Sequence, residues 1–280
     1  MHRVNVSYFG ICGAHGFDTC VHVVYMMCSI LQAHGIGNDA VGIASIRRGE
    51  VKIVKCLTPR GLLIDLPLTP KLVEELSGRT VLASTGSYTV AEESSYRYIQ
   101  PFVDCREELL LLHDGYVENY VKYYHELKKR GHRFVTEVNG NVISSEVVVH
   151  MLEECLEDAV NLLDALLMVC SKLSNDLRGV VVAVHRDIED ICAVAVCRDV
   201  SRVRKVAVAV DENSWAFASF RDRVLGQEIA LGMKALAPVL SLMNKPTTEI
   251  LRYGEAALLT PGKLVKRCIN QDRKRVLIEW

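Results

Sequence analysis

The chain has 280 residues, of which half are hydrophobic and 24% are charged, and its formal net charge is −1. These proportions are ordinary for a globular protein, and the length suits one large domain or two small ones. A net charge this close to zero provides no overall field to attract nucleic acid or an anionic membrane surface. The sequence has no apolar run of membrane-spanning length and begins with no convincing signal peptide, so we expect a cytoplasmic protein.

Ten cysteines are many for a cytoplasmic chain. Most lie inside apolar segments, where cysteine behaves as a small hydrophobic residue. Glutamine is scarce, which favours a thermophilic source. Cys12-x-x-His15 followed by Cys20-x-His22 offers four zinc ligands, but the second pair is too tightly spaced and runs into an apolar helix. We therefore expect no metal site and no cofactor.

Apolar patterning predicts blocks of strands and helices. In chain order we expect a strand over 4–12, a loop over 13–18, a buried helix over 20–33, a hairpin of strands 41–46 and 50–56, a short helix over 72–76 and a strand over 80–83. A strand beginning at 109, a helix over 120–130 and two helical pieces within 145–173 follow. The remaining prediction is strands at 179–185, 191–198, 205–210 and 216–218, a helix near 223–231, and strands at 256–259 and 274–280. Because no linker divides this series, we expect a single domain over residues 1–280, built from packed sheets and helices and not from parallel βαβ units.

The segment LLLLHDGYVEN, residues 109–119, is the most informative stretch. Four leucines predict a fully buried strand, and the apolar run breaks at His113-Asp114-Gly115. Polar residues and a glycine at such a position can aim backbone N–H groups at a ligand, although an ordinary strand-to-helix turn has the same pattern.

Several segments resemble, in unbroken order, the motifs of class II glutamine amidotransferases, and in particular the glutaminase half of amidophosphoribosyltransferase. LQAHGIGNDAVGI (31–43) resembles LQHRGQDSAGI, the QPF segment (100–102) recurs, LLHDGYVEN resembles LAHNGNLVN, and ISSEV (143–147) resembles SDTEV. Weaker likenesses follow at Arg178-Gly179, Cys197-Arg198-Asp199, Phe217-Ala218-Ser219 and Tyr253-Gly254-Glu255. The likeness covers nearly the whole chain, and the family's second catalytic domain has no counterpart in it.

The resemblance implies an α+β fold, the four-layer αββα sandwich of the N-terminal-nucleophile (Ntn) hydrolases, with two mainly antiparallel sheets. It also implies a mechanism in which a processed N-terminal cysteine attacks the glutamine amide and its own α-amine serves as the base. In the family an asparagine and the following glycine form the oxyanion hole, an arginine binds the substrate carboxylate and an aspartate binds the ammonium.

Two alignments place the nucleophile differently. In the first, Cys12-Gly13-x-x-Gly16 matches the family's C-G-x-x-G start, and residues 1–11 are a propeptide that must be removed. In the second, residues 6–11 match the family's CGVFGI. Val6 then stands at the nucleophile position, and Cys12 becomes an internal residue of a buried strand.

The other pocket positions have changed. By the resemblance, Asp114 replaces the oxyanion-hole asparagine, and an ionised carboxylate cannot donate a hydrogen bond. Gly115 is kept. Gly86 or Ser87 falls where the carboxylate-binding arginine belongs, and Ser144 replaces the ammonium-binding aspartate.

Two functions remain open. The chain is either a class II amidotransferase-like protein with weak or no glutaminase activity that binds a ligand or partner, or an active Ntn amidohydrolase that uses Cys12 after processing. In both cases Cys12, Asp114 and Gly115 are the candidate catalytic residues, and Ser87 and Ser144 are the candidate substrate-binding residues. The expected partners are a small amide or amino-acid-like ligand, a synthase subunit and a second copy of the chain, but neither nucleic acid nor membrane.

Overall fold

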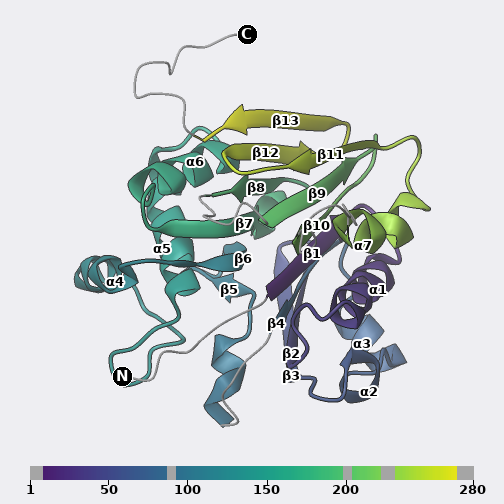
Figure 1. Ribbon diagram of the computed structural model, residues 1–280, viewed down its shortest axis with the longest axis horizontal. Coiled ribbons are helices and arrows are strands. Elements are labelled where there is room, and N and C mark those ends of the chain that lie inside the picture. Colours follow the sequence, from purple (N-terminus) through teal and green to yellow (C-terminus); the bar gives the residue numbers. More distant parts are fainter. Residues whose placement is uncertain (1–8, 87–92, 198–203, 222–230, 270–280) are drawn as a thin grey trace.

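The protein folds into two antiparallel sheets that lie face to face between layers of helices (Figure 1). The structure, a computed structural model, describes residues 9–86, 93–197, 204–221 and 231–269. All pairings between its named strands are antiparallel. The predicted αββα sandwich is confirmed.

The first sheet has seven strands in the order β11-β9-β10-β1-β4-β2-β3. Its central strand β1 is completely buried and pairs with β4 on one side and β10 on the other. The strands are β1 (Phe9–His15), β2 (Ala40–Arg47), β3 (Glu50–Leu57), β4 (Thr80–Gly86), β9 (Arg204–Val210), β10 (Trp215–Arg221) and β11 (Thr247–Leu251).

The second sheet has six strands in the order β13-β12-β8-β7-β6-β5. Strand β6 contains the four leucines of the HDG segment and pairs along its whole length with β7. The strands are β5 (Phe102–Val103), β6 (Leu109–Val117), β7 (Leu177–His185), β8 (Cys192–Val196), β12 (Glu255–Thr260) and β13 (Lys263–Cys268).

Helices cover the outer face of each sheet (Figure 1). On the first sheet lie α1 (Cys20–Ala33), α2 (Leu62–Asp65), α3 (Pro70–Glu75) and α7 (Leu231–Leu240). On the second sheet lie α5 (Ser144–Asp158) and α6 (Leu162–Lys172), and α4 (Tyr120–Lys129) packs against α5. The short 3₁₀ helices η1 (Glu93–Tyr98) and η2 (Arg186–Ile188) connect strands. No helix among the described residues is long and apolar enough to cross a membrane.

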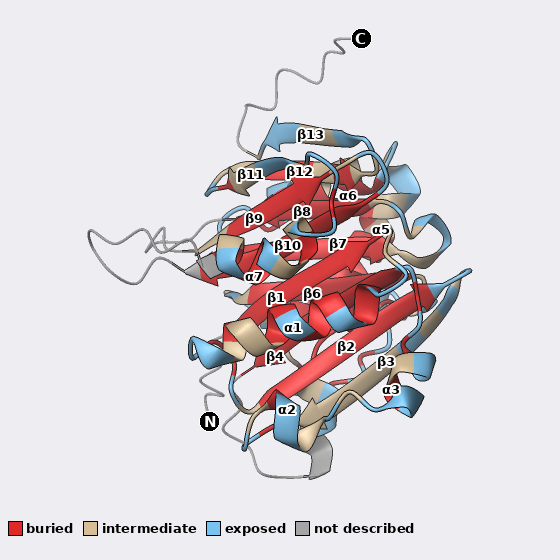
Figure 2. Ribbon diagram, turned by 90° about the vertical axis from the view of Figure 1, so that its right-hand side faces the viewer, coloured by how far each residue is buried: buried red, intermediate tan, exposed pale blue. Residues whose placement is uncertain are grey.

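Three hydrophobic cores result from this layering, and Figure 2 shows the buried strands in red. One lies between the first sheet and α1 and α7, and another lies between the second sheet and α5 and α6. The third lies between the two sheets and includes Ile11, Leu112 and Phe217. Since successive residues of a strand point to opposite faces, neighbours in β1 contribute to different cores.

Most predicted elements are present, with several differences. The strand predicted over 4–12 is described from Phe9 and continues to His15, so the loop expected to begin at residue 13 is wrong. Strands β5, β11 and β13 and the short helix α2 were missed. The helix predicted near 223–231 lies mostly outside the described residues, and α7 begins only at its last residue. The strand predicted at 274–280 also lies outside them.

Candidate functional site

The HDG segment lies on β6, in the second sheet, and contacts β1 of the first sheet. The residues of β6 alternate between two environments. Leu110 and Leu112 face the other sheet, whereas Leu109 and Leu111 face the helices. By this alternation Asp114 faces the interface between the sheets, and His113 faces α5.

Cys12 lies in the middle of β1, with no exposed surface. Its Sγ atom is 3.5 Å from Sγ of Cys28 on α1, so the side chain belongs to the core between the first sheet and the helices. Burial, with a further contribution from Cys28, raises the pKa of Cys12 well above its ordinary value. Because the thiolate is the nucleophilic form, a thiol in this environment is inert. This internal position is the one that the second alignment assigns to Cys12.

The three strand residues that precede Cys12 are fully integrated into the sheet. Phe9, Gly10 and Ile11 pair with Gly86, Thr85 and Ser84 of β4. The backbone N–H of Ile11 also donates to the hydroxyl of Ser219 on β10, at 2.9 Å. Cleavage before Cys12 would therefore remove part of the central strand.

Asp114 is completely buried and lies beside an arginine. Its Oδ1 atom is 3.4 Å from Nε of Arg204, at the start of β9 in the first sheet. The arginine compensates the charge of the carboxylate across the sheet interface. An ionised Asp114 accepts hydrogen bonds and cannot donate one to an oxyanion.

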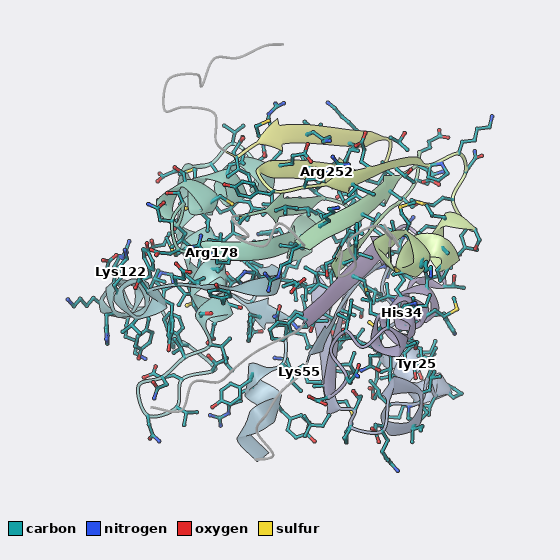
Figure 3. The ribbon with its side chains drawn as sticks, viewed as in Figure 1. Tyr25, His34, Lys55, Lys122, Arg178 and Arg252 are labelled. Carbon is teal, nitrogen blue, oxygen red and sulfur yellow. The ribbon has the colours of Figure 1, made fainter. Side chains whose placement is uncertain are left out.

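Gly115 lies where β6 and β7 approach each other very closely. A Cβ atom on Gly115 would be 1.8 Å from the backbone oxygen of Arg178, and one on Gly179 would be 2.0 Å from the oxygen of Asp114. Both positions therefore require glycine for the packing of the two strands. The arginine that precedes Gly179, labelled in Figure 3, uses Nε and Nη2 to bind the carboxylate of Glu118, at 3.2 and 2.6 Å.

His113 is buried and has a hydrogen-bond partner for each ring nitrogen. Nδ1 is 2.9 Å from the hydroxyl of Ser145, and Nε2 is 2.8 Å from the backbone oxygen of Arg178. Burial dominates and lowers the pKa of His113 to about 4, and the nearby Arg204 also lowers it. The neutral ring thus donates through Nε2 and accepts through Nδ1, as a satisfied core histidine does.

Two other polar residues of the family-like segments accept hydrogen bonds from backbone N–H groups. The hydroxyl of Ser144, at the start of α5, accepts from the backbone N–H of Val117, at 3.2 Å. The carboxylate of Glu146 accepts from the N–H groups of Val135 and Thr136, at 2.6 and 3.0 Å. Ser87, the other candidate substrate-binding residue, lies outside the described residues.

Gln100 joins the QPF segment to the HDG strand. Its side chain donates to the backbone oxygen of His113 at 2.8 Å and accepts from the N–H of the same residue at 2.6 Å. Its own backbone oxygen accepts from the hydroxyl of Ser84 on β4 and lies where a side chain on Gly42 would collide with it. The family-like glycine at 42 thus serves a close contact.

The structure therefore does not bring the predicted catalytic residues together on one surface. Cys12 faces the helices on the outer side of the first sheet, whereas Asp114 faces the inner side. Asp114 and Gly115 are neighbours on β6, and Ser144 lies beyond the end of that strand.

The four ligand candidates considered in the sequence also remain apart. The thiol of Cys20 donates to the backbone oxygen of Ala14, and Nδ1 of His15 is 2.6 Å from the hydroxyl of Thr80. A different group does converge at the helical side of the second sheet, from three separate segments that share no short motif. It comprises Cys105, His132, His150 and Glu153. The only local signal in the sequence is the His-x-x-Glu spacing at 150 and 153, which places both side chains on one face of α5.

The chain is similar in sequence to glutamine–fructose-6-phosphate aminotransferases (isomerizing). It is 31% identical to that of Sulfurisphaera tokodaii over 121 residues, which are 43% of this chain and 19% of the relative. It is 28% identical to that of Streptomyces coelicolor over 221 residues, which are 75% of this chain and 31% of the relative. The chain thus spans less than a third of either relative. No family model matches the chain.

Solved structures share the fold at low sequence identity. An allosteric regulatory enzyme of purine biosynthesis aligns with a TM-score of 0.68 and 17% identity, over 94% of this chain and 49% of its own. The glutamine phosphoribosylpyrophosphate amidotransferase of B. subtilis aligns with a TM-score of 0.66 and 17% identity, over 94% and 50%. A glutamine aminotransferase class-II domain protein from Silicibacter pomeroyi aligns with a TM-score of 0.52 and 11% identity, over 94% of this chain and all of its own. The chain therefore has the fold of the class II glutamine amidotransferases, as its ordered motifs predicted.

Proposed function

We propose that residues 1–280 act as one class II glutamine amidotransferase-like domain with weak or no glutaminase activity, which binds a small amide or amino-acid-like ligand or a partner subunit. The observation that supports this most strongly is the orientation of Cys12. Its thiol is buried against α1, on the opposite side of the first sheet from Asp114. A nucleophile and its oxyanion donors must instead meet around one substrate carbonyl.

The pairing of Asp114 with Arg204 gives independent support. Losing one oxyanion donor costs other enzymes about 3 kcal/mol, and a carboxylate at that position costs at least as much. Charge-assisted bonds to the substrate's carboxylate and ammonium are worth about 1.5–3 kcal/mol each. By the resemblance, the arginine and aspartate that form them are replaced, so useful affinity for free glutamine is lost.

The alternative function is an amidohydrolase that uses Cys12 after removal of residues 1–11. It would have to sever β1 and give up the pairing of Phe9, Gly10 and Ile11 with β4. An uncharged amide would be its natural substrate, since the residues expected to bind an amino-acid end are replaced.

Two measurements test the proposal. Ammonia release from glutamine should stay at background and should be unchanged in Cys12→Ala, with Cys28→Ala as the matched control for an altered core. Intact mass should show that the purified chain keeps residues 1–11. Glutamine turnover at enzyme-like rates that Cys12→Ala abolishes, together with a mature chain that begins at Cys12, would establish the alternative.

Asp114→Asn tests the oxyanion position separately. The amide restores a donor but leaves Arg204 without its carboxylate, so we expect a less stable protein that is still inactive towards glutamine. A gain of glutaminase activity in this variant, dependent on Cys12, would show that a catalytic arrangement survives.

A further inference from the structure

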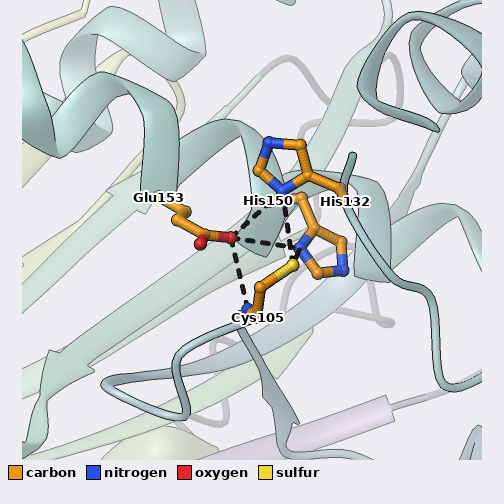
Figure 4. Close-up of side chains that lie close together, drawn as sticks. All are labelled: Cys105, His132, His150 and Glu153. Atoms are coloured by element: carbon orange, nitrogen blue, oxygen red, sulfur yellow. Dashed lines mark hydrogen bonds and ion pairs between the residues drawn. The ribbon is translucent and has the colours of Figure 1, made fainter. Parts of the chain in front are cut away.

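Four side chains with metal-binding atoms converge outside the candidate glutaminase site (Figure 4). Cys105 lies in the turn between β5 and β6, His132 lies in the loop after α4, and His150 and Glu153 lie one turn apart on α5. Their ligand atoms all lie within 4.8 Å of one another. His150 is completely buried, and the side chains of His132 and Glu153 are 11% and 9% exposed.

Four of the six separations between the ligand atoms have the length of a tetrahedral edge around a metal ion, and the other two are at most 4.8 Å. Sγ of Cys105 is 3.5 Å from Nδ1 of His132 and 3.5 Å from Nδ1 of His150. Oε2 of Glu153 is 3.1 Å and 3.4 Å from the same two nitrogens. Tetrahedral zinc, with bonds of about 2.3 Å to sulfur and about 2.0–2.2 Å to nitrogen and oxygen, requires ligand separations of about 3.2–3.6 Å.

The outward-facing nitrogens of the two histidines lie near carboxylates, at different distances. Nε2 of His132 is 3.2 Å from Oε1 of Glu154, and Nε2 of His150 is 3.9 Å from Oε1 of Glu146. The bond to Glu154 fixes the ring of His132 so that Nδ1 points inward, which is the usual support of a metal-bound histidine. Nε2 of His150 is buried without a hydrogen-bond partner among the described residues. The backbone N–H of Arg133 donates to Sγ of Cys105 at 3.4 Å, and such a bond stabilises a thiolate.

The charges balance for a divalent cation. A thiolate and one carboxylate supply two negative charges, and the two neutral imidazoles supply none. The second oxygen of Glu153, Oε1, faces Nε of Arg106 at 3.6 Å, so only Oε2 is directed at the centre. A ligand set of one sulfur, two nitrogens and one oxygen suits zinc better than magnesium or calcium, which prefer oxygen ligands.

We propose that Cys105, His132, His150 and Glu153 bind a structural zinc ion that fastens the β5–β6 turn and the loop after α4 to α5. Four protein ligands close the coordination sphere, which is the arrangement of structural and not of catalytic zinc. The ion also lies on the helical side of the second sheet, away from the interface that contains Asp114. The sequence expectation of no metal site considered only the cysteines and histidines near the N-terminus.

Metal analysis of the tag-free protein, together with cobalt substitution, tests this site. We expect one zinc per chain after exposure to zinc and dialysis. The Co²⁺ form should show tetrahedral d–d bands and a thiolate-to-cobalt charge-transfer band. Cys105→Ser should lose the charge-transfer band and weaken zinc binding by roughly 100-fold or more, since even changes behind a ligand cost about 10–100-fold.

Matched controls separate this site from the remaining cysteines and histidines. Cys268→Ser and His125→Asn alter exposed residues of the same types and should bind zinc as the wild type does. Glu154→Gln keeps all four ligands and should weaken binding by about 10–100-fold. It also provides a test should Cys105→Ser fail to fold.

A metal-free alternative exists, in which Glu153 simply accepts bonds from both imidazoles and from the backbone N–H of Cys105, at 3.2 Å. That arrangement predicts no stoichiometric zinc and no cobalt–thiolate band in the wild-type protein. Either result would overturn the proposal, as would zinc binding that Cys105→Ser leaves unchanged.

Discussion

At the scale of single residues, the HDG segment combines three different roles in three consecutive positions. His113 completes a hydrogen-bond network with α5 and β7, Asp114 compensates Arg204 across the sheet interface, and Gly115 permits the close approach of β7. None of these contacts requires a substrate. All three residues of the segment that most resembles an active site therefore have structural contacts, which hold the two sheets and α5 together.

The protonation of His113 should make stability depend on pH. Burial lowers its pKa from 6.5 to about 4, so below pH 6.5 the unfolded state takes up a proton that the folded state refuses. The contribution of this residue is thus complete above pH 6.5 and is lost as the pH falls to about 4, a change of about 3 kcal/mol. Urea unfolding at several pH values between 8 and 4 measures it.

His15 has its pKa lowered to about 4 as well, chiefly by burial, so the comparison must isolate His113. His113→Asn should be less stable than the wild type at pH 8, because its shorter side chain loses a bond. Between pH 6.5 and 4 the variant should lose about 3 kcal/mol less than the wild type. If the free energy of unfolding depended on pH in the same way for both proteins, His113 would not be the source of the pH dependence.

The sequence alone could place these residues on strands, but it could not show to which face of the sheet each side chain points. The motif order identified Asp114 and Gly115 as neighbours at one site, and both do lie on β6. It could not decide whether Cys12 faces Asp114, because a shift of one residue along a strand reverses the face to which a side chain points. The alternation of Ile11 and Cys12 between two cores follows only from the observed strand pairing.

At the scale of secondary-structure elements, local composition was informative where packing agreed with it. The helix predicted over residues 20–33 has those bounds, since its apolar residues are buried against the first sheet. Strand β11 was missed because its residues TTEIL are mostly polar or half-exposed and form an edge. Gly13 and Gly16 indicated a loop over residues 13–18, but β1 continues to His15, where Gly13 lies close to Leu82 and Phe217, and the loop begins only at Gly16.

The pairing of β6 with β7 depends on glycine, and substitution should reveal this. Gly115→Ala should destabilise the protein by at least about 3 kcal/mol, because the added methyl group would lie 1.8 Å from a backbone oxygen and the strands would have to separate. Thermal and urea unfolding measure the change.

Gly140→Ala is the matched control. Gly140 has a left-handed backbone with φ of 76° but open space around its Cβ position, so its substitution should cost only about 1 kcal/mol. Equal costs at the two positions would show that conformation and not the close approach explains Gly115.

At the scale of the whole molecule, Gln100 joins parts of both sheets. It has no exposed surface, its side chain bonds the backbone of β6, and its backbone contacts β4 and β2. Truncation to alanine would leave the N–H and C=O of His113 without their partner in a dry interior. Such orphaned groups cost about 1–3 kcal/mol each.

We therefore expect Gln100→Ala to lower the free energy of unfolding by about 2–4 kcal/mol. Gln32→Ala is the matched control, since the side chain of that glutamine on α1 also makes hydrogen bonds, but only to two loop residues and to the start of α2. Because Gln32 is half-buried, water can replace its bonds, and its loss should cost less. A similar cost for both variants would argue against a special role of Gln100.

The global arrangement of sheets was predictable only through the family likeness, since composition and periodicity indicate packed sheets without their order. The cluster at Cys105 was not predictable as a whole, because its only local signal is the spacing of His150 and Glu153. Its ligands come from a turn, a loop and a helix, and Cys105 and His132 are 27 residues apart. Only the folded chain brings them together, because β5, β6 and α4 all pack against α5.

The buried cysteines lie in both halves of the sandwich, so their alkylation can report on the unfolding of each half. Three of the seven buried cysteines belong to the first sheet and its helices, and four belong to the second sheet and its helices. A membrane-permeant alkylating reagent would reach each group only when the corresponding layer opens, since burial keeps these thiols out of solvent. The order in which the two groups become modified would therefore record, without any engineered label, whether the halves of the sandwich unfold together or in succession.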